Sequence, residues 1–305
     1  MRLFPPTKHL SHLPALRGLC LLATTAVLLA SCGLAAGLSQ PGHRSGAPEG
    51  ESLPIEPATS SVTGSRPLAG ARSAGARLRA AAATVPTLPT ARQIAEAPAV
   101  GALFGLAGRH LGAHFCTGSV VSSSRGDLVL TAAHCVSGAS SIAFVPGYHD
   151  HEAPYGIWPV AKVLVDRRWQ SSKDPNDDFA FLVVRRVDGR TLQAVTGAEQ
   201  IAFGTPARGS VQVTGYPDSA SRPRTCTNNL RRYSGTQFEF DCWGYTDGTS
   251  GSPLLKDLSG PDGLGKVVGV IGGYLQGGDL QQVSYAARFG PQMKSLYEVA
   301  AASLP

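Results

Sequence analysis

Aromatic residues are scarce in this sequence of 305 residues, and residues 33–98 contain no Phe, Tyr or Trp at all. Ala, Gly, Ser, Pro and Arg dominate that stretch instead. Such a composition cannot bury enough apolar surface to offset the entropy lost on ordering. We therefore expect residues 33–98 to be a disordered linker or pro-segment, and residues 99–305 to form one folded domain.

The expected domain also lacks a surplus of positive charge. The net charge is +6, but residues 1–99 hold 9 Lys/Arg against 4 Asp/Glu, and the remainder holds 18 against 17. A nearly neutral domain offers no basic face to a phosphate backbone. We therefore do not expect nucleic acid as a partner.

The apolar run near the N-terminus, residues 19–30, is too short to span a bilayer comfortably. It follows the basic residues Arg2, Lys8 and Arg17, as in an export signal. Residues 29–32 read Leu-Ala-Ser-Cys and resemble the lipobox of bacterial lipoproteins, in which the cysteine is lipidated. We expect residues 1–32 to be an export signal and Cys32 to be the lipidation candidate. Ordinary cleavage nearby, with free secretion instead of a lipid anchor on the outer face of the membrane, is the alternative.

The sequence has six cysteines but no C-x-x-C pair. Two of them, Cys20 and Cys32, lie in the targeting region. Four widely spaced cysteines remain in the domain: Cys116, Cys135, Cys226 and Cys242. An even number in an exported protein favours two disulfides over a zinc site. We expect no metal and no other cofactor.

Helical periodicity is missing from the domain until residues 291–304, which predict a C-terminal helix. Before that point, short runs of β-branched and aromatic residues alternate with turn residues. These runs cover 118–123, 127–133, 141–147, 158–165, 179–187, 209–217 and 266–275. No internal repeat is visible. The pattern predicts an all-β antiparallel barrel or sandwich.

The stretch Thr-Ala-Ala-His-Cys at 131–135 places a histidine beside a cysteine. His134 is either an imidazole that must be held still because it moves protons, or a core histidine next to a disulfide. The five residues alone do not decide between these alternatives.

A second stretch places Ser250 in a turn between Gly248 and Gly251. A serine hydroxyl needs a base within hydrogen-bond reach, and the oxyanion formed on attack needs backbone N–H donors. Gly248 frees the backbone so that the amides of Gly248 and Ser250 can converge, and Gly251 lets the chain turn away. The sequence does not fit the G-x-S-x-G elbow of other hydrolases.

A carboxylate that orients the histidine is expected between these two stretches. Asp178 leads the apolar run 179–187, where a carboxylate is costly to bury unless it pairs with a donor such as an imidazole N–H. We therefore choose Asp178 and expect its neighbour Asp177 to be solvated.

The stretches 131–135, 177–181 and 248–253, in this order, resemble the chymotrypsin-type serine peptidases. Residues 215–217 and 250–253 bring the resemblance closer to the bacterial glutamyl-endopeptidase-like branch. It covers most of residues 99–290 and implies two six-stranded antiparallel β-barrels packed together, with a short C-terminal α-helix. It also implies His134 as general base and then acid, Asp178 as its orienting group, Ser250 as nucleophile, and the amides of Gly248 and Ser250 as oxyanion hole.

The resemblance further implies a disulfide between Cys116 and Cys135, since residues 114–121 look like the strand that bridges to the histidine turn. Cys226 and Cys242 are then left to pair with each other.

The sequence departs from the family pattern at several places. Thr249 stands where zymogens carry an aspartate, so we expect activity to tolerate extra residues before Val100. Gly244 stands at the expected base of the substrate pocket, where trypsins carry an aspartate, and a neutral residue before the scissile bond is therefore expected over Arg or Lys. Gly272 and Gly273 are expected to line the cleft. Glutamate specificity is not supported either, because Ile271 or Gly272 replaces the relevant histidine.

The sequence thus predicts an exported, monomeric serine endopeptidase that acts on polypeptides. The alternative is a non-catalytic, surface-anchored binding protein on a peptidase fold. Degenerate relatives lose a triad residue or the oxyanion glycine, whereas this sequence keeps all four.

Overall fold

The computed structural model describes residues 87–305, apart from 109, 140, 261 and 262. The predicted export signal with Cys32, and residues 33–86 of the predicted linker, lie outside the described residues. Those that are described belong to one compact unit. No helix in this part of the chain has the length and apolar character that a membrane crossing needs.

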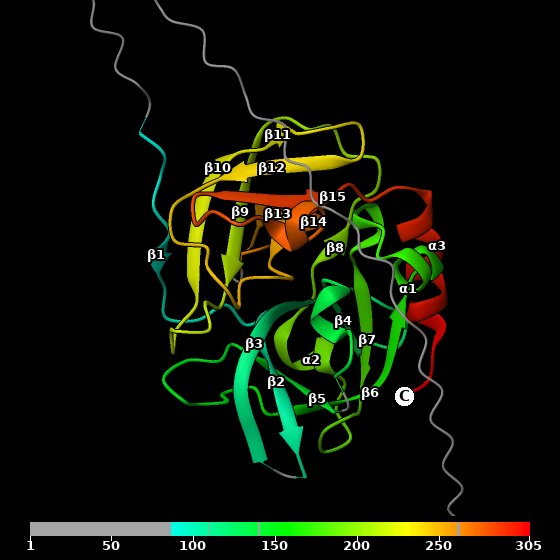
Figure 1. The fold of residues 1–305 in the computed structure, drawn as a ribbon. Coiled ribbons are helices and arrows are strands. Elements are labelled where there is room, and N and C mark those ends of the chain that lie inside the picture. Colours follow the sequence, from blue (N-terminus) through cyan, green and yellow to red (C-terminus); the bar gives the residue numbers. More distant parts are fainter. Residues whose placement is uncertain (1–86, 109, 140, 261–262) are drawn as a thin grey trace, which may run out of the picture. The chain divides into compact units, whose positions relative to one another are not determined.

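Six strands of the first half close into an antiparallel barrel in the order β2-β3-β4-β7-β6-β5 (Figure 1). They are β2 (Val100–Ala107), β3 (His110–Val120), β4 (Leu128–Thr131), β5 (Ile142–Pro146), β6 (Trp158–Val165) and β7 (Ala180–Val184). Every residue of β4, β5 and β7 is buried, as expected for continuous apolar runs. The barrel interior is filled by large side chains that include Leu103, Val129, Phe144, Trp158 and Leu182.

The strands after the barrel form two sheets together with β1, which precedes it (Figure 1, β1 in teal, β10 and β12 in yellow). The larger has the order β1-β10-β9-β13-β14-β8 and the smaller the order β11-β12-β15. The strands are β1 (Arg92–Gln93), β8 (Gln200–Ile201), β9 (Ser210–Gly215), β10 (Arg224–Asn229), β11 (Arg231–Arg232), β12 (Gln237–Asp241), β13 (Pro253–Ser259), β14 (Leu264–Val270) and β15 (Val283–Ala287).

A second closed barrel is not confirmed, because a barrel needs an unbroken ladder of strands. Between β10 and β12 the connection is a disulfide, Cys226–Cys242, and a side-chain hydrogen bond from Asn228 Nδ2 to Asp241 O at 2.6 Å. On the other side a single isolated bridge joins Ile271 to Ala286. Side chains therefore join β10 to β12, and only a single backbone bridge joins β14 to β15, whereas continuous backbone ladders join all six strands of the first barrel.

The folded domain begins before residue 99, the boundary that composition predicts. β1 pairs with β10, and the backbone N–H of Ala91 donates to Trp243 O at 2.8 Å. Trp243 N–H donates in turn to Pro89 O at 2.9 Å. The end of the predicted linker is therefore part of the fold. Backbone hydrogen bonds hold this segment in place, and side-chain composition does not predict such bonds.

Helices are few and mostly short: α1 (Arg167–Ser172), α2 (Leu192–Thr196) and α3 (Pro291–Ala302), with 3₁₀ turns η1 (His134–Val136), η2 (Pro175–Asp177) and η3 (Tyr274–Gly277). α3 is the predicted C-terminal helix. Its Met293 and Ala300 pack into a core that also contains Phe181 of the barrel and Val267 of the larger sheet. This shared core joins the two halves of the domain.

One buried carboxyl makes the stability of the fold depend on pH. Glu199 is 2% exposed, forms no ion pair in the described part of the chain, and accepts a hydrogen bond from Gly265 N–H. Burial raises the pKa of Glu199 from 4.5 to about 7. Because the folded state holds this proton more tightly than the unfolded chain, the contribution of Glu199 to stability is fully present below pH 4.5 and is lost as pH rises through 7.

We expect Glu199→Gln to remove this pH dependence, since an amide cannot ionise and its oxygen can still accept from Gly265. Between pH 4.5 and 8 the wild type should lose about 3 kcal/mol of unfolding free energy relative to the variant. Urea unfolding at both pH values measures the difference. Glu298→Gln, at an exposed carboxyl on α3, is the control. Equal pH slopes for wild type and Glu199→Gln would contradict the prediction.

Candidate active site

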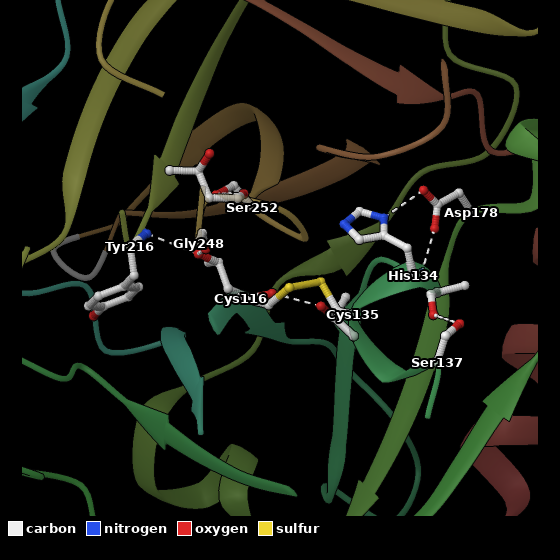
Figure 2. Close-up of a disulfide and its surroundings, with 12 residues drawn as sticks. Cys116, His134, Cys135, Ser137, Asp178, Tyr216, Gly248 and Ser252 are labelled. Carbon is white, nitrogen blue, oxygen red and sulfur yellow. Dashed lines mark hydrogen bonds and ion pairs between the residues drawn. A yellow bond between two sulfur atoms is a disulfide. The ribbon is translucent and has the colours of Figure 1, made fainter. Parts of the chain in front are cut away.

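His134 and Asp178 lie side by side because their strands are neighbours in the barrel. Thr131, at the end of β4, pairs with Ala180, at the start of β7. The next turn after β4 carries His134, and the turn before β7 carries Asp178. The imidazole Nδ1 lies 2.8 Å from Asp178 Oδ2, and the backbone N–H of His134 donates to Asp178 Oδ1 at 2.9 Å (Figure 2).

The Asp178 carboxylate is fully buried, with 0% exposure, yet well supplied with donors. Besides the two bonds from His134, it accepts a third from Gly273 N–H at 2.8 Å. A Cβ at Gly272 would lie only 3.0 Å from Oδ2, so the chain passes close to the carboxylate. A buried carboxylate that accepts three hydrogen bonds can hold the imidazole in one orientation.

Asp177 is not solvated, contrary to expectation. It is 1% exposed, and the Arg168 guanidinium covers it, with Nε 2.8 Å from Oδ2 and Nη2 2.9 Å from Oδ1. Burial raises the pKa of Asp177, and the hydrogen bond from Arg168 opposes that rise. The two neighbouring carboxylates therefore serve different partners.

The turn that carries Ser250 connects β12 to β13, and all four carbonyls from 247 to 250 accept hydrogen bonds. Asp247 O accepts from Asp218 N–H at 2.8 Å, and Thr249 O accepts from the N–H and the hydroxyl of Ser252 at 3.0 and 2.6 Å. Thr117 serves the other two: its hydroxyl donates to Gly248 O at 3.0 Å, and its N–H donates to Ser250 O at 2.8 Å. By contrast, the amides of Gly248 and Ser250 find no acceptor among the described residues. The turn is thus fixed through its carbonyls, and these two donors are left for an anion.

Glycine is required at both ends of this turn. Gly248 has φ +88°, and a Cβ there would lie 2.3 Å from Asp218 N. Gly251 has φ +84°, and a Cβ would lie 2.1 Å from Thr117 O. Both positions combine a left-handed backbone with a close approach to another segment, the turn at Asp218 for Gly248 and β3 for Gly251.

His134, Gly248 and Ser250 line one cleft of about 840 Å³. Figure 2 shows the imidazole bonded to Asp178 through one nitrogen, with its other edge on the side of Gly248. Ser250 is partly exposed, and its hydroxyl forms no hydrogen bond within the described residues, including none to His134. Catalytic hydrogen bonds of this kind often tighten only when substrate binds.

The three glycines expected to line the substrate pocket adjoin residues that do line it: Gly244 precedes Tyr245, and Gly272 and Gly273 follow Ile271. Gly244, Gly272 and Gly273 are not among the residues that line the cleft. Gly244 lies next to Arg224 and Ala91, and the other two support Asp178. The expected preference for neutral residues, which rested on Gly244, therefore stays a prediction without this support.

Residues 275–281 line the cleft instead, and sequence reasoning missed them. Leu275 and Gln276 adopt left-handed φ values of 50° and 52°, which non-glycine residues rarely do. The Gly277–Gly278 pair is the only local signal of this turn. The acidic lining residues are Asp247 and Asp279, and none of the lining residues is Lys or Arg.

Both expected disulfides are present, Cys116–Cys135 and Cys226–Cys242, with Cα–Cα distances of 6.1 and 6.6 Å. The first ties β3 to the turn that carries His134 (Figure 2). Cys116, His134 and Cys135 also place potential metal ligands within 4.8 Å of one another. The two cysteines are bonded to each other and offer no thiolate, so this group does not fit a metal ion.

Comparison with known proteins agrees with this geometry. The family model described as a trypsin-like peptidase domain matches residues 116–270. A curated protein of Bacillus subtilis (strain 168), named an extracellular metalloprotease, is 31% identical over 153 residues, which is 47% of each chain. The chain therefore spans about half the length of this relative.

Two solved structures share the fold. The protease Anisep from Arthrobacter nicotinovorans is 25% identical, with a TM-score of 0.61, covering 70% of this chain and 100% of its own. The thermostable serine protease AL20 from an extremophilic microorganism is 25% identical, with a TM-score of 0.59, covering 68% of this chain and 99% of its own.

Proposed function

The chain belongs to the trypsin-like peptidase family, and from this premise we propose that it is a serine endopeptidase whose triad is His134, Asp178 and Ser250. Family and fold support proteolysis in general. The observation that carries the finer proposal is the turn 247–250. Its carbonyls are all bonded, while the Gly248 and Ser250 amides stay free in the cleft that His134 lines.

The proposed reaction has two halves. Ser250 Oγ attacks the peptide carbonyl while its proton passes to His134 Nε2, and the new oxyanion accepts from the Gly248 and Ser250 amides. His134 then gives the proton to the leaving nitrogen as the C–N bond breaks, and water repeats the sequence to release the acyl group. Asp178 keeps the proton of His134 on Nδ1, which leaves Nε2 free to accept.

Covalent labelling tests this proposal directly. A fluorophosphonate probe should phosphonylate the Ser250 oxygen with loss of fluoride, so that the protein gains the mass of the probe less HF. His134→Ala should abolish this labelling, since the hydroxyl loses its base. Peptide mapping by mass spectrometry measures both. A folded protein that does not react, or that reacts at another serine, would favour the non-catalytic binding protein.

We also propose that no cut at Val100 is needed for activity. Val100 N–H donates to Ala97 O at 2.9 Å, and the chain before it continues into β1. The buried Thr249 hydroxyl donates to Thr246 O at 2.6 Å and carries no charge that could pair with a new ammonium group. The turn is therefore formed with residues before Val100 in place.

Export of the chain remains a proposal. Two disulfides in the folded domain support an oxidising compartment outside the cytoplasm. We also propose that Cys32 is lipidated, which mass spectrometry of the membrane fraction would detect. We further propose that the protein is a monomer.

A further inference from the structure

Thr117 in β3 is the one residue of the barrel that holds the nucleophile turn at two points. Its backbone N–H donates to Ser250 O at 2.8 Å, and its hydroxyl donates to Gly248 O at 3.0 Å. The hydroxyl oxygen also accepts from Tyr216 N–H at 2.9 Å. Thr117 is 0% exposed, so water cannot replace these bonds. The hydroxyl is thus a buried link between the barrel, the end of β9 and the turn.

The Gly248 carbonyl alone depends on a side chain. Backbone amides serve the other three carbonyls of the turn: Asp218 N for Asp247, Ser252 N for Thr249 and Thr117 N for Ser250. A substitution can therefore remove only the partner of Gly248 without altering the backbone.

The peptide unit held by this bond lies between the two that matter for catalysis. The unit 247–248 presents the Gly248 amide, and the unit 249–250 presents the Ser250 amide. The unit 248–249 joins them, and Gly248 has no Cβ to limit its rotation. If the Gly248 carbonyl loses its donor, rotation at this glycine changes the angle between the two oxyanion donors.

We propose that Thr117 is a positioning residue that aligns the Gly248 and Ser250 amides through its hydroxyl. The proposal rests on the proposed function, because the alignment matters only if an oxyanion forms there. Thr117 itself touches no reacting atom. Thr117 is not part of the sequence motif around Ser250, because it lies next to Cys116, more than a hundred residues before the nucleophile.

Thr117→Val keeps the shape of the side chain but removes the hydroxyl. Losing one oxyanion donor outright costs about 10²–10³ in kcat, and misalignment should cost about 10- to 100-fold. KM should change little, because the ground-state carbonyl gains little from these amides. Affinity for a peptide boronic acid, which forms a tetrahedral adduct on the nucleophile, should fall by the same factor as kcat.

Two controls separate positioning from stability. Thr117→Ser keeps the hydroxyl and should restore kcat and boronate affinity. Thr225→Val removes an equally connected buried hydroxyl in β10, which donates to Val213 O at 3.1 Å and accepts from Thr214 Oγ1 at 2.9 Å. It should lower the unfolding free energy as Thr117→Val does, with kcat unchanged. Should Thr117→Val fail to fold, Thr117→Ala removes the same hydroxyl with less steric demand.

The experiment measures kcat, KM, boronate affinity and urea unfolding for the wild type and these variants. A parallel loss of kcat and boronate affinity in Thr117→Val, with both restored in Thr117→Ser, supports the proposal. Wild-type values in Thr117→Val overturn it. Equal kinetic losses in Thr117→Val and Thr225→Val overturn it too, because they would reflect stability alone. A wild type that neither labels nor cleaves peptides would overturn the proposed function itself, and this inference with it.

Discussion

Ser250→Ala is expected to lower kcat by about 10⁶-fold, because members of a catalytic triad act as a unit and the remaining groups have nothing to activate. His134→Ala should cost about as much. The residual rate comes from substrate binding and from the Gly248 and Ser250 amides, which stay in place. Turnover of a peptide library, with unfolding measured in parallel, tests both variants.

Ser252→Ala is the matched control for Ser250→Ala, since the two serines lie in the same turn. The Ser252 hydroxyl donates to Thr249 O, and the Ser252 backbone N–H donates to the same oxygen and remains in the variant. We expect less than about a tenfold loss, because one of the two bonds persists. Wild-type turnover in Ser250→Ala would show that another residue is the nucleophile.

The triad candidates could be found in the sequence because the chemistry restricts residue types over short stretches. A histidine after an apolar strand, an aspartate before one and a serine among glycines are local patterns. The pairing of β4 with β7 then brings the first two together, as Thr131 and Ala180 show. The strands of the barrel and α3 were predictable for a similar reason, since short apolar runs and helical periodicity mark them, whereas closure of the barrel was implied only by the family resemblance.

The features that sequence reasoning missed depend on contacts that only the folded chain makes. We expected Asp177 in solvent because no sequence motif around it predicts the hydrogen bond from Arg168 that covers its carboxylate. β1 has neither apolar residues nor length, and only its pairing with β10 makes it a strand. Whether the second half closes depends on backbone register between β10 and β12, where a disulfide and Asn228 take the place of a ladder.

The substrate cleft was the least predictable part for a physical reason. Residues 275–281 reach it through left-handed conformations at Leu275 and Gln276, which side-chain propensities argue against. Gly244 does not itself line the cleft; its backbone N–H donates to the lining residue Gln281 at 3.1 Å, and it lies beside Arg224 and Ala91. Loop conformations and packing of this kind are set by tertiary contacts, so a motif-based alignment places such residues poorly.

Asp178→Asn is expected to lower kcat/KM by about 10⁴-fold while the site keeps its shape. The reason lies in the three donors that meet the carboxylate. Oδ1 accepts from the His134 backbone N–H, and Oδ2 accepts from the imidazole Nδ1–H and from Gly273 N–H. An amide has only one oxygen, so in either orientation its NH₂ group faces a donor. With the NH₂ toward Nδ1, the imidazole must carry its proton on Nε2, where it cannot accept one from Ser250.

Asp177→Asn makes the same chemical change one residue earlier and is the matched control. Its carboxylate bonds to Arg168 and has no contact with His134. We expect this variant to leave kcat/KM within about threefold of the wild type, because Asp177 pairs with the half-exposed Arg168 and not with the imidazole. Peptide kinetics and urea unfolding of both variants give the comparison. If Asp177→Asn caused the larger kinetic loss, Asp177 and not Asp178 would be the orienting carboxylate, and the hydrogen bonds at Asp178 would serve only to anchor the turn between η2 and β7.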